Sequence, residues 1–123
     1  MHTLYGIKSC DTVKKARMWL DQHNVPYRFH DFRNDGLTAE RLDDFISRSD
    51  WQTLLNRSST SWRQLSDADK SELTPEKAHH LMLANPTLIK RPVLDTGTAL
   101  IIGFSAKTGG YAAYLPTLDI VGS

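Results

Sequence analysis

Hydrophobic and polar positions alternate along the first third of the chain with periods that predict a strand, a helix and a second strand. Residues 3–7 (TLYGI) form an apolar run that is long enough for a buried strand and too short for a helix. Apolar side chains then recur at helical spacing over residues 13–20, after small polar residues that can cap a helix. Residues 27–32 alternate aromatic and polar side chains, as half-buried strands do. The pattern predicts β-α-β, with Cys10 where the first strand gives way to the helix.

Asn34-Asp35-Gly36 after the second strand is a turn sequence. The middle of the chain that follows it predicts helices only. Thr38 precedes a run with an apolar helical face, and residues 51–55 and 62–65 have the pattern of short helical pieces. Residues 74–76 (TPE) give a strong helix start: a cap, a proline at the first helical position and an acid in the first turn. Asn85, which precedes a proline, ends that helix.

The last third predicts a β-hairpin and a helix. Residues 88–94 and 98–104 are apolar segments joined by Asp-Thr-Gly at 95–97, a turn sequence. A final helix is expected around residues 111–115. Two parallel strands joined by a helix, together with a hairpin, predict an α/β protein with a mixed four-stranded sheet.

Composition narrows the class of protein. The 123 residues fit one domain, and 15 basic against 14 acidic residues leave a formal charge of +1. This balance gives no electrostatic reason to expect nucleic-acid or membrane binding. Residues 1–7 lack the features of a signal peptide, and no apolar run has the length of a membrane span. One cysteine suits a reducing compartment, and the histidines lack metal-ligand spacing. We therefore expect a cytoplasmic monomer without a bound metal or cofactor.

Cys10 is the residue with the most distinctive chemistry. A cysteine at a helix N-terminus lies beside unpaired backbone N–H groups, which favour the nucleophilic thiolate. Lys8 and Lys14 add positive charge nearby, and Asp11 opposes it. The alternative is a small cysteine that only packs. Because the chain has no second cysteine, turnover needs an outside thiol such as glutathione, or a glutaredoxin.

Two segments resemble a known family. LYGIKSCDTVKKA at residues 4–16 and LIKRPVL at residues 88–94, with a helical middle between them, are similar to the ArsC/Spx/YffB group. The resemblance covers residues 1–104, and LLNRSSTSWRQL at residues 54–65 is typical of the YffB-like branch. It implies one ArsC-like domain over residues 1–123 with a thioredoxin-like, glutaredoxin-type fold. The thioredoxin-like part spans about residues 1–35 and 87–116, with a helical insertion at about residues 37–85.

The resemblance also implies roles for particular residues. Cys10 would be the nucleophile, and Arg91 would stabilise the thiolate and bind an anionic group of the substrate. The bond before Pro92 would be cis, with the proline against the cysteine. Arg57 stands where the family has another anion-binding arginine, although a shift by one residue would put Asn56 there. The remaining expected substrate-binding residues surround the cysteine: Lys8, Ser9, Thr12 and Lys14.

We expect a glutathione-dependent thiol reductase that acts through a mixed disulfide on a small oxidised substrate. One alternative is a glutaredoxin-coupled arsenate reductase. Against it, Gly6-Ile7-Lys8 stands where arsenate reductases carry His-Asn-Pro, and Lys14 stands where they carry arginine. A second alternative is a non-catalytic, Spx-like protein that binds RNA polymerase. The single cysteine excludes the Cys-x-x-Cys switch that is common in Spx proteins.

Overall fold

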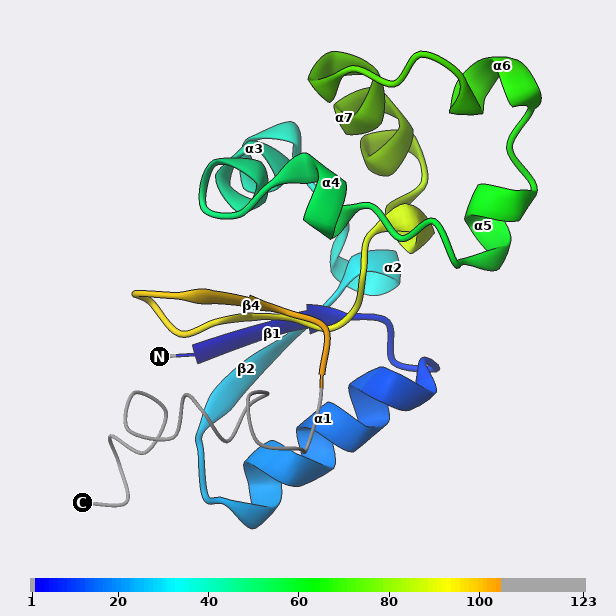
Figure 1. Cartoon of the computed structure of the whole chain (residues 1–123). Coiled ribbons are helices and arrows are strands. Elements are labelled where there is room, and N and C mark those ends of the chain that lie inside the picture. The colour runs from blue at the N-terminus through cyan, green and yellow to red at the C-terminus, as the bar shows by residue number, and fades with distance from the viewer. Residues whose placement is uncertain (1, 105–123) are drawn as a thin grey trace. The chain divides into compact units, whose positions relative to one another are not determined.

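The computed structural model describes residues 2–104, which form two units that we treat separately (Figure 1). The sheet unit holds the described residues up to Gly36 and from Arg91 onward. The helical unit runs from Leu37 to Lys90. The helix expected around residues 111–115 lies outside the described residues.

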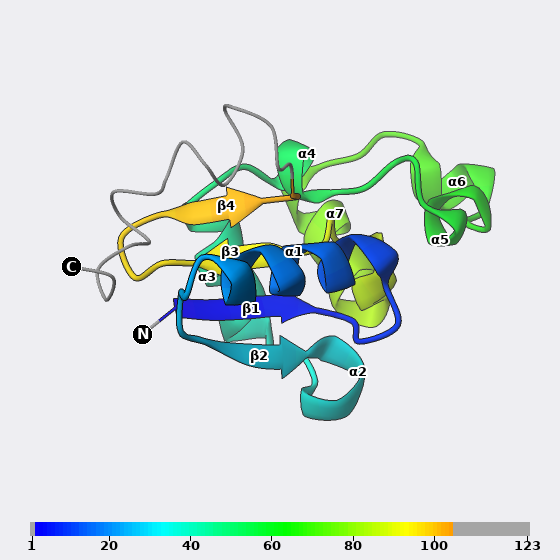
Figure 2. The same ribbon diagram turned by 90° about the horizontal axis from the view of Figure 1, so that it is seen from below.

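The sheet unit contains the mixed four-stranded sheet that the sequence predicted. Its order is β2-β1-β3-β4; β1 pairs parallel with β2 and antiparallel with β3, and β3 pairs antiparallel with β4. In register, Gly6 lies opposite Asp31 and Tyr5 lies opposite Val93. The ends of β1 and β2 and the start of β3 therefore meet at one end of the sheet (Figure 2). The strands are β1 (His2–Gly6), β2 (Tyr27–Asp31), β3 (Val93–Asp95) and β4 (Leu100–Ile102).

Helix α1 (Asp11–Gln22) covers one face of this sheet (Figure 1). Its spacing of apolar side chains predicted the face that packs: Val13, Ala16 and Leu20 are buried, and Trp19 joins them. The core between helix and sheet gains its stability from the removal of these apolar surfaces from water. The other buried members of this core are Leu4, Val25, Leu94 and Ile101.

A short helix, α2 (Phe32–Asp35), replaces the predicted last strand residue and turn after β2. The Asp31 side chain accepts a hydrogen bond from the N–H of Arg33 at 2.8 Å and so caps the helix. Gly36, with φ of +80°, ends it in a conformation that glycine adopts readily. The cap and the glycine decide the local structure, and the prediction of a plain turn was wrong.

Strand β3 is shorter than the predicted strand at residues 88–94. Leu88 ends a 3-10 helix, η1 (Pro86–Leu88), and Ile89 forms a bridge with Leu55. These residues pair within the helical unit, so they are not available to the sheet. The strand begins only at Val93.

The helical unit confirms the two strongest predicted helix starts. The Thr38 hydroxyl accepts a hydrogen bond from an N–H in the first turn of α3, and Thr74 does the same for α7. Helix α5 begins at Thr60, earlier than predicted, because Ser59 caps it. Helix α6, capped by Ser66, was not predicted. The helices are α3 (Ala39–Ser47), α4 (Trp51–Leu54), α5 (Thr60–Arg63), α6 (Asp67–Lys70) and α7 (Pro75–Ala84). Within residues 2–104, no helix is both long and apolar enough to span a bilayer.

Candidate functional site

Cys10 occupies the N-cap position of α1, where the sequence placed it. Its backbone is extended, its N–H donates to the carbonyl of Ile7 at 3.0 Å, and its carbonyl accepts from the N–H of Lys14 at 3.0 Å. The half-buried side chain makes no capping hydrogen bond. The thiol therefore stands at the positive end of a 12-residue helix whose first N–H groups it leaves uncapped.

The loop before Cys10 is held by a carboxylate from the neighbouring strand. One oxygen of Asp31, Oδ2, accepts from the N–H of Lys8 at 3.3 Å, and the other, Oδ1, accepts from the N–H of Arg33 at 2.8 Å. The Asp31 side chain is buried, and its own N–H donates to Asp35 at 2.9 Å. A single buried carboxylate thus connects the β1–α1 loop to α2.

A pocket of about 440 Å3 opens beside this loop. This volume is within the range of small-molecule sites. Three residues around it come from the predicted set, namely Lys8, Ser9 and Lys14. Four others were not predicted: Ile7, Asp31, Arg33 and Asn34. The predicted parallel pairing of the first two strands could have revealed the residues that follow the second strand. Parallel strands bring their carboxyl ends to one edge of a sheet.

Arg91 and Pro92 precede β3 at the same end of the sheet. The peptide bond between them is cis, as the family resemblance predicted. The Pro92 carbonyl accepts from the N–H of Gly103 at 2.8 Å. Nε and Nη1 of Arg91 are buried, and neither has a hydrogen-bond partner within residues 2–104. A buried guanidinium nitrogen without a hydrogen-bond partner destabilises the fold unless an anionic group accepts a hydrogen bond from it.

The other predicted residues differ in their surroundings. Thr12 is exposed in the first turn of α1, and Lys14 lies 4.0 Å from the Asp11 carboxylate. Arg57 belongs to the helical unit, where its guanidinium lies 5.7 Å from the ring centre of Trp62.

Asn56, the alternative to Arg57, has a structural task in the helical unit. Its Oδ1 accepts from the N–H of Ser58 at 3.0 Å, and its N–H donates to the Leu88 carbonyl at 2.7 Å. These bonds hold Asn56 to its own turn and to the distant segment at Leu88.

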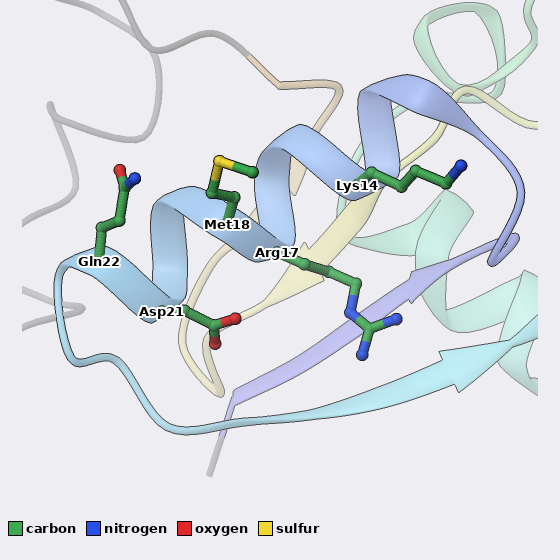
Figure 3. Close-up of a pocket in the computed structure, with 5 residues that line it drawn as sticks. All are labelled: Lys14, Arg17, Met18, Asp21 and Gln22. Atoms are coloured by element: carbon green, nitrogen blue, oxygen red, sulfur yellow. The ribbon is translucent and has the colours of Figure 1, made fainter.

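A separate groove runs along α1 away from Cys10 (Figure 3). Arg17 reaches from it toward β2, where its Nε donates to the Tyr27 hydroxyl at 3.1 Å and its guanidinium stacks 4.3 Å from the Phe29 ring centre. Because Arg17 is held by these contacts, we assign it a structural role. Lys14 extends toward the N-terminal end of the helix and borders both this groove and the pocket beside Cys10.

Two histidines lie close to polar groups of nearby residues. His79 Nε2 lies 2.8 Å from a carboxylate oxygen of Asp43, and His30 Nε2 lies 2.7 Å from the Gly36 carbonyl. Each therefore has a local structural partner. Over the described part of the chain, no group of three or more His, Cys, Asp or Glu side chains is placed to hold a metal ion.

Comparison with known proteins adds the family context. The model of the ArsC family matches residues 5–109. A solved structure of a YffB protein superimposes with a TM-score of 0.86 at 47% identity and covers 96% of this chain and 99% of its own. An arsenate reductase (ArsC) related protein from Brucella melitensis gives a TM-score of 0.75 at 46% identity, covering 93% of each chain. The global transcriptional regulator Spx of Streptococcus mutans is 30% identical over 118 residues, which is 94% of this chain and 84% of the regulator.

Proposed function

This chain belongs to the ArsC family, and from that premise we propose that it is a glutathione-dependent thiol reductase with Cys10 as its nucleophile. The observation that carries the proposal is the place of the thiol. Cys10 lies at the uncapped N-terminus of α1, at the end of the sheet where Arg91 and cis-Pro92 also lie. A partly exposed thiol beside helix N–H groups suits nucleophilic attack better than packing.

In the first step, the Cys10 thiolate attacks the glutathionyl sulfur of a mixed disulfide between glutathione and the substrate. A sulfur–sulfur bond forms between Cys10 and glutathione, the original disulfide bond breaks, and the substrate leaves as a thiolate that takes a proton from water. The N–H groups in the first turn of α1 stabilise the negative charge as it moves between sulfur atoms.

In the second step, the thiolate of another glutathione attacks the glutathionyl sulfur on Cys10. Oxidised glutathione leaves and the Cys10 thiolate is restored, so one further glutathione thiol is consumed for each mixed disulfide that is reduced. A glutaredoxin can supply this second thiol in the same way. Since Cys10 is the chain's single cysteine, no thiol of the same chain competes for the intermediate.

Arg91 would provide the charge that matches an anionic substrate group. Its buried and unpartnered Nε and Nη1 leave a guanidinium edge for a carboxylate or an oxyanion. Lys8, Ser9 and Lys14 would contact the same substrate from the pocket beside Cys10.

The test is steady-state reduction of a glutathionylated peptide, coupled to glutathione reductase. We expect turnover by the natural chain and loss of that turnover in Cys10→Ser. Circular dichroism shows whether the variant keeps its fold. If a folded Cys10→Ser variant retained full activity, the mechanism would be wrong.

A second candidate is the reduction of arsenate. It is favoured by the unpartnered guanidinium of Arg91, which suits an oxyanion, and by the arsenate reductase related protein of Brucella melitensis at 46% identity. An assay with arsenate, glutathione and glutaredoxin separates the two functions. Turnover comparable with that of an established arsenate reductase would favour this candidate over the first.

A regulator-like role is the third candidate, because Spx of Streptococcus mutans is 30% identical over most of this chain. Its test is affinity capture of RNA polymerase subunits with the natural chain and with Cys10→Ser. Equal capture by both forms would support binding that does not depend on the thiol.

A further inference from the structure

The pocket beside Cys10 has a charge distribution that selects a ligand. Lys8, Lys14 and Arg33 contribute three positive charges to its lining, and Asp31 contributes the one negative charge. Both oxygens of Asp31 already accept backbone N–H bonds, from Lys8 and Arg33. Asp11 approaches only Lys14, at 4.0 Å, in an exposed pair that solvent screens. The pocket therefore presents an excess of positive charge.

Two of the three cations are free to bind a ligand. Within residues 2–104, neither the Lys8 ammonium nor the Arg33 guanidinium has an ion-pair partner. Both side chains are exposed, so an incoming anion can reach them. A guanidinium presents a planar fork that matches a carboxylate in two hydrogen bonds, which an ammonium cannot do.

The backbone holds Arg33 next to the cysteine loop. The N–H of Arg33 and the N–H of Lys8 bind the two oxygens of the same buried Asp31 carboxylate. The parallel pairing of Gly6 with Asp31 sets that carboxylate beside the end of β1. Arg33 is thus tied to the segment that carries the thiol.

Residues on either side of Cys10 in the sequence border the pocket. Ser9, which precedes Cys10, lines the pocket, and Lys14 lies four residues along the helix, about 6 Å in axial rise. In glutathione the sulfur is on the central residue, so each terminal carboxylate lies within about two residues of it, roughly 7 Å when extended. A glutathionyl group joined to Cys10 can therefore place a carboxylate in this pocket.

We infer that the pocket binds a carboxylate of a peptide disulfide that reacts with Cys10, and that Arg33 is the residue that sets this specificity. The inference rests on the proposed reaction at Cys10 and adds the substrate class: disulfides that carry a carboxylate within tripeptide reach of the sulfur. Arg33 acts on substrate binding and leaves the sulfur chemistry to Cys10.

The experiment measures the rate constant of mixed disulfide formation at Cys10 with two disulfides. Oxidised glutathione carries carboxylates, and bis(2-hydroxyethyl) disulfide carries no charge. Each rate is followed by mass spectrometry of the intact protein. The variant is Arg33→Gln, and the matched control is Arg28→Gln, since Arg28 is an exposed arginine on β2 that does not line the pocket.

We expect Arg33→Gln to slow the reaction with oxidised glutathione about tenfold or more, which is the size of a lost charge-assisted hydrogen bond. The rate with the neutral disulfide should stay the same. Arg28→Gln should change both rates by less than about twofold, as a distant exposed charge does.

Three results would contradict the inference. Equal slowing by Arg33→Gln and Arg28→Gln would mean that overall charge attracts the substrate. Equal slowing of both disulfides by Arg33→Gln would mean that Arg33 acts on the thiol and not on the carboxylate. If the natural chain reacted with neither disulfide, the proposed function itself would be wrong. The proposed role of the pocket, which rests on it, would then be wrong as well.

Discussion

The buried guanidinium nitrogens of Arg91 are unfavourable for the fold, and the proposed function gives them a purpose. Its Nε and Nη1 are buried without a hydrogen-bond partner in the described part of the chain. An unsatisfied buried polar group destabilises a fold, and an anionic ligand that accepted hydrogen bonds from it would offset that cost. The residue is therefore better explained by a ligand than by the fold.

Replacing Arg91 with methionine should separate the two effects. We expect the free energy of unfolding in urea to stay the same or to rise by about 1 kcal/mol, because a buried unpaired charge is removed and a flexible apolar chain fills the space. The rate of glutathione-dependent reduction should fall about tenfold or more, because the anionic substrate loses its partner. A less stable variant with full activity would show that Arg91 is structural.

The roles of Cys10 and Arg33 differ in how far sequence could reveal them. Cys10 was predicted because its chemistry depends on local neighbours, namely the strand before it and the helix after it. Arg33 is 23 residues from Cys10 in sequence and follows a different strand. Only the register of β1 with β2, which places Gly6 opposite Asp31, brings the two segments together.

Among the elements, β1 and α1 approach most closely at Gly6. A Cβ atom at this position would lie 2.7 Å from Cγ2 of Val13, a distance that real Cβ contacts essentially never show. Val13 is fully buried in the face of α1 that covers the sheet. Glycine at this position therefore allows the helix that carries Cys10 to pack closely against β1.

Gly6→Ala should lower the free energy of unfolding by about 1–3 kcal/mol, as overpacking of a core does. Urea denaturation measures the change. In the control, Val13→Ala removes the methyl groups that clash. The double variant should then lose less stability than the sum of the two single variants. Strict additivity would mean that the contact between Gly6 and Val13 does not limit the packing of α1.

Elements with local signals were predicted, and elements set by distant partners were not. Helices α3 and α7 were found from Thr38 and Thr74, because a cap acts within one turn of its own chain. The strand predicted at residues 88–94 begins only at Val93, because Ile89 pairs with Leu55, a contact that no local pattern indicates. Helix α6 was missed although its cap, Ser66, stood in the sequence.

At the scale of the whole molecule, the proposed site residues are distributed over the two units. The sheet unit holds Cys10, Arg33 and Arg91, and thus the proposed nucleophile and two proposed anion-binding residues. The helical unit holds Arg57, and its role in substrate binding stays a prediction, as does the expected monomeric state.

The central claim is that the Cys10 thiol of the folded protein exchanges with glutathione. The most direct measurement is mass spectrometry of the native chain after incubation with oxidised glutathione, followed by proteolytic mapping. We predict one glutathionyl group on the peptide that contains Cys10, its removal by reduced glutathione, and no adduct in Cys10→Ser. A natural chain that acquires the adduct only after it is unfolded would contradict the account, because its cysteine would then be a packing residue.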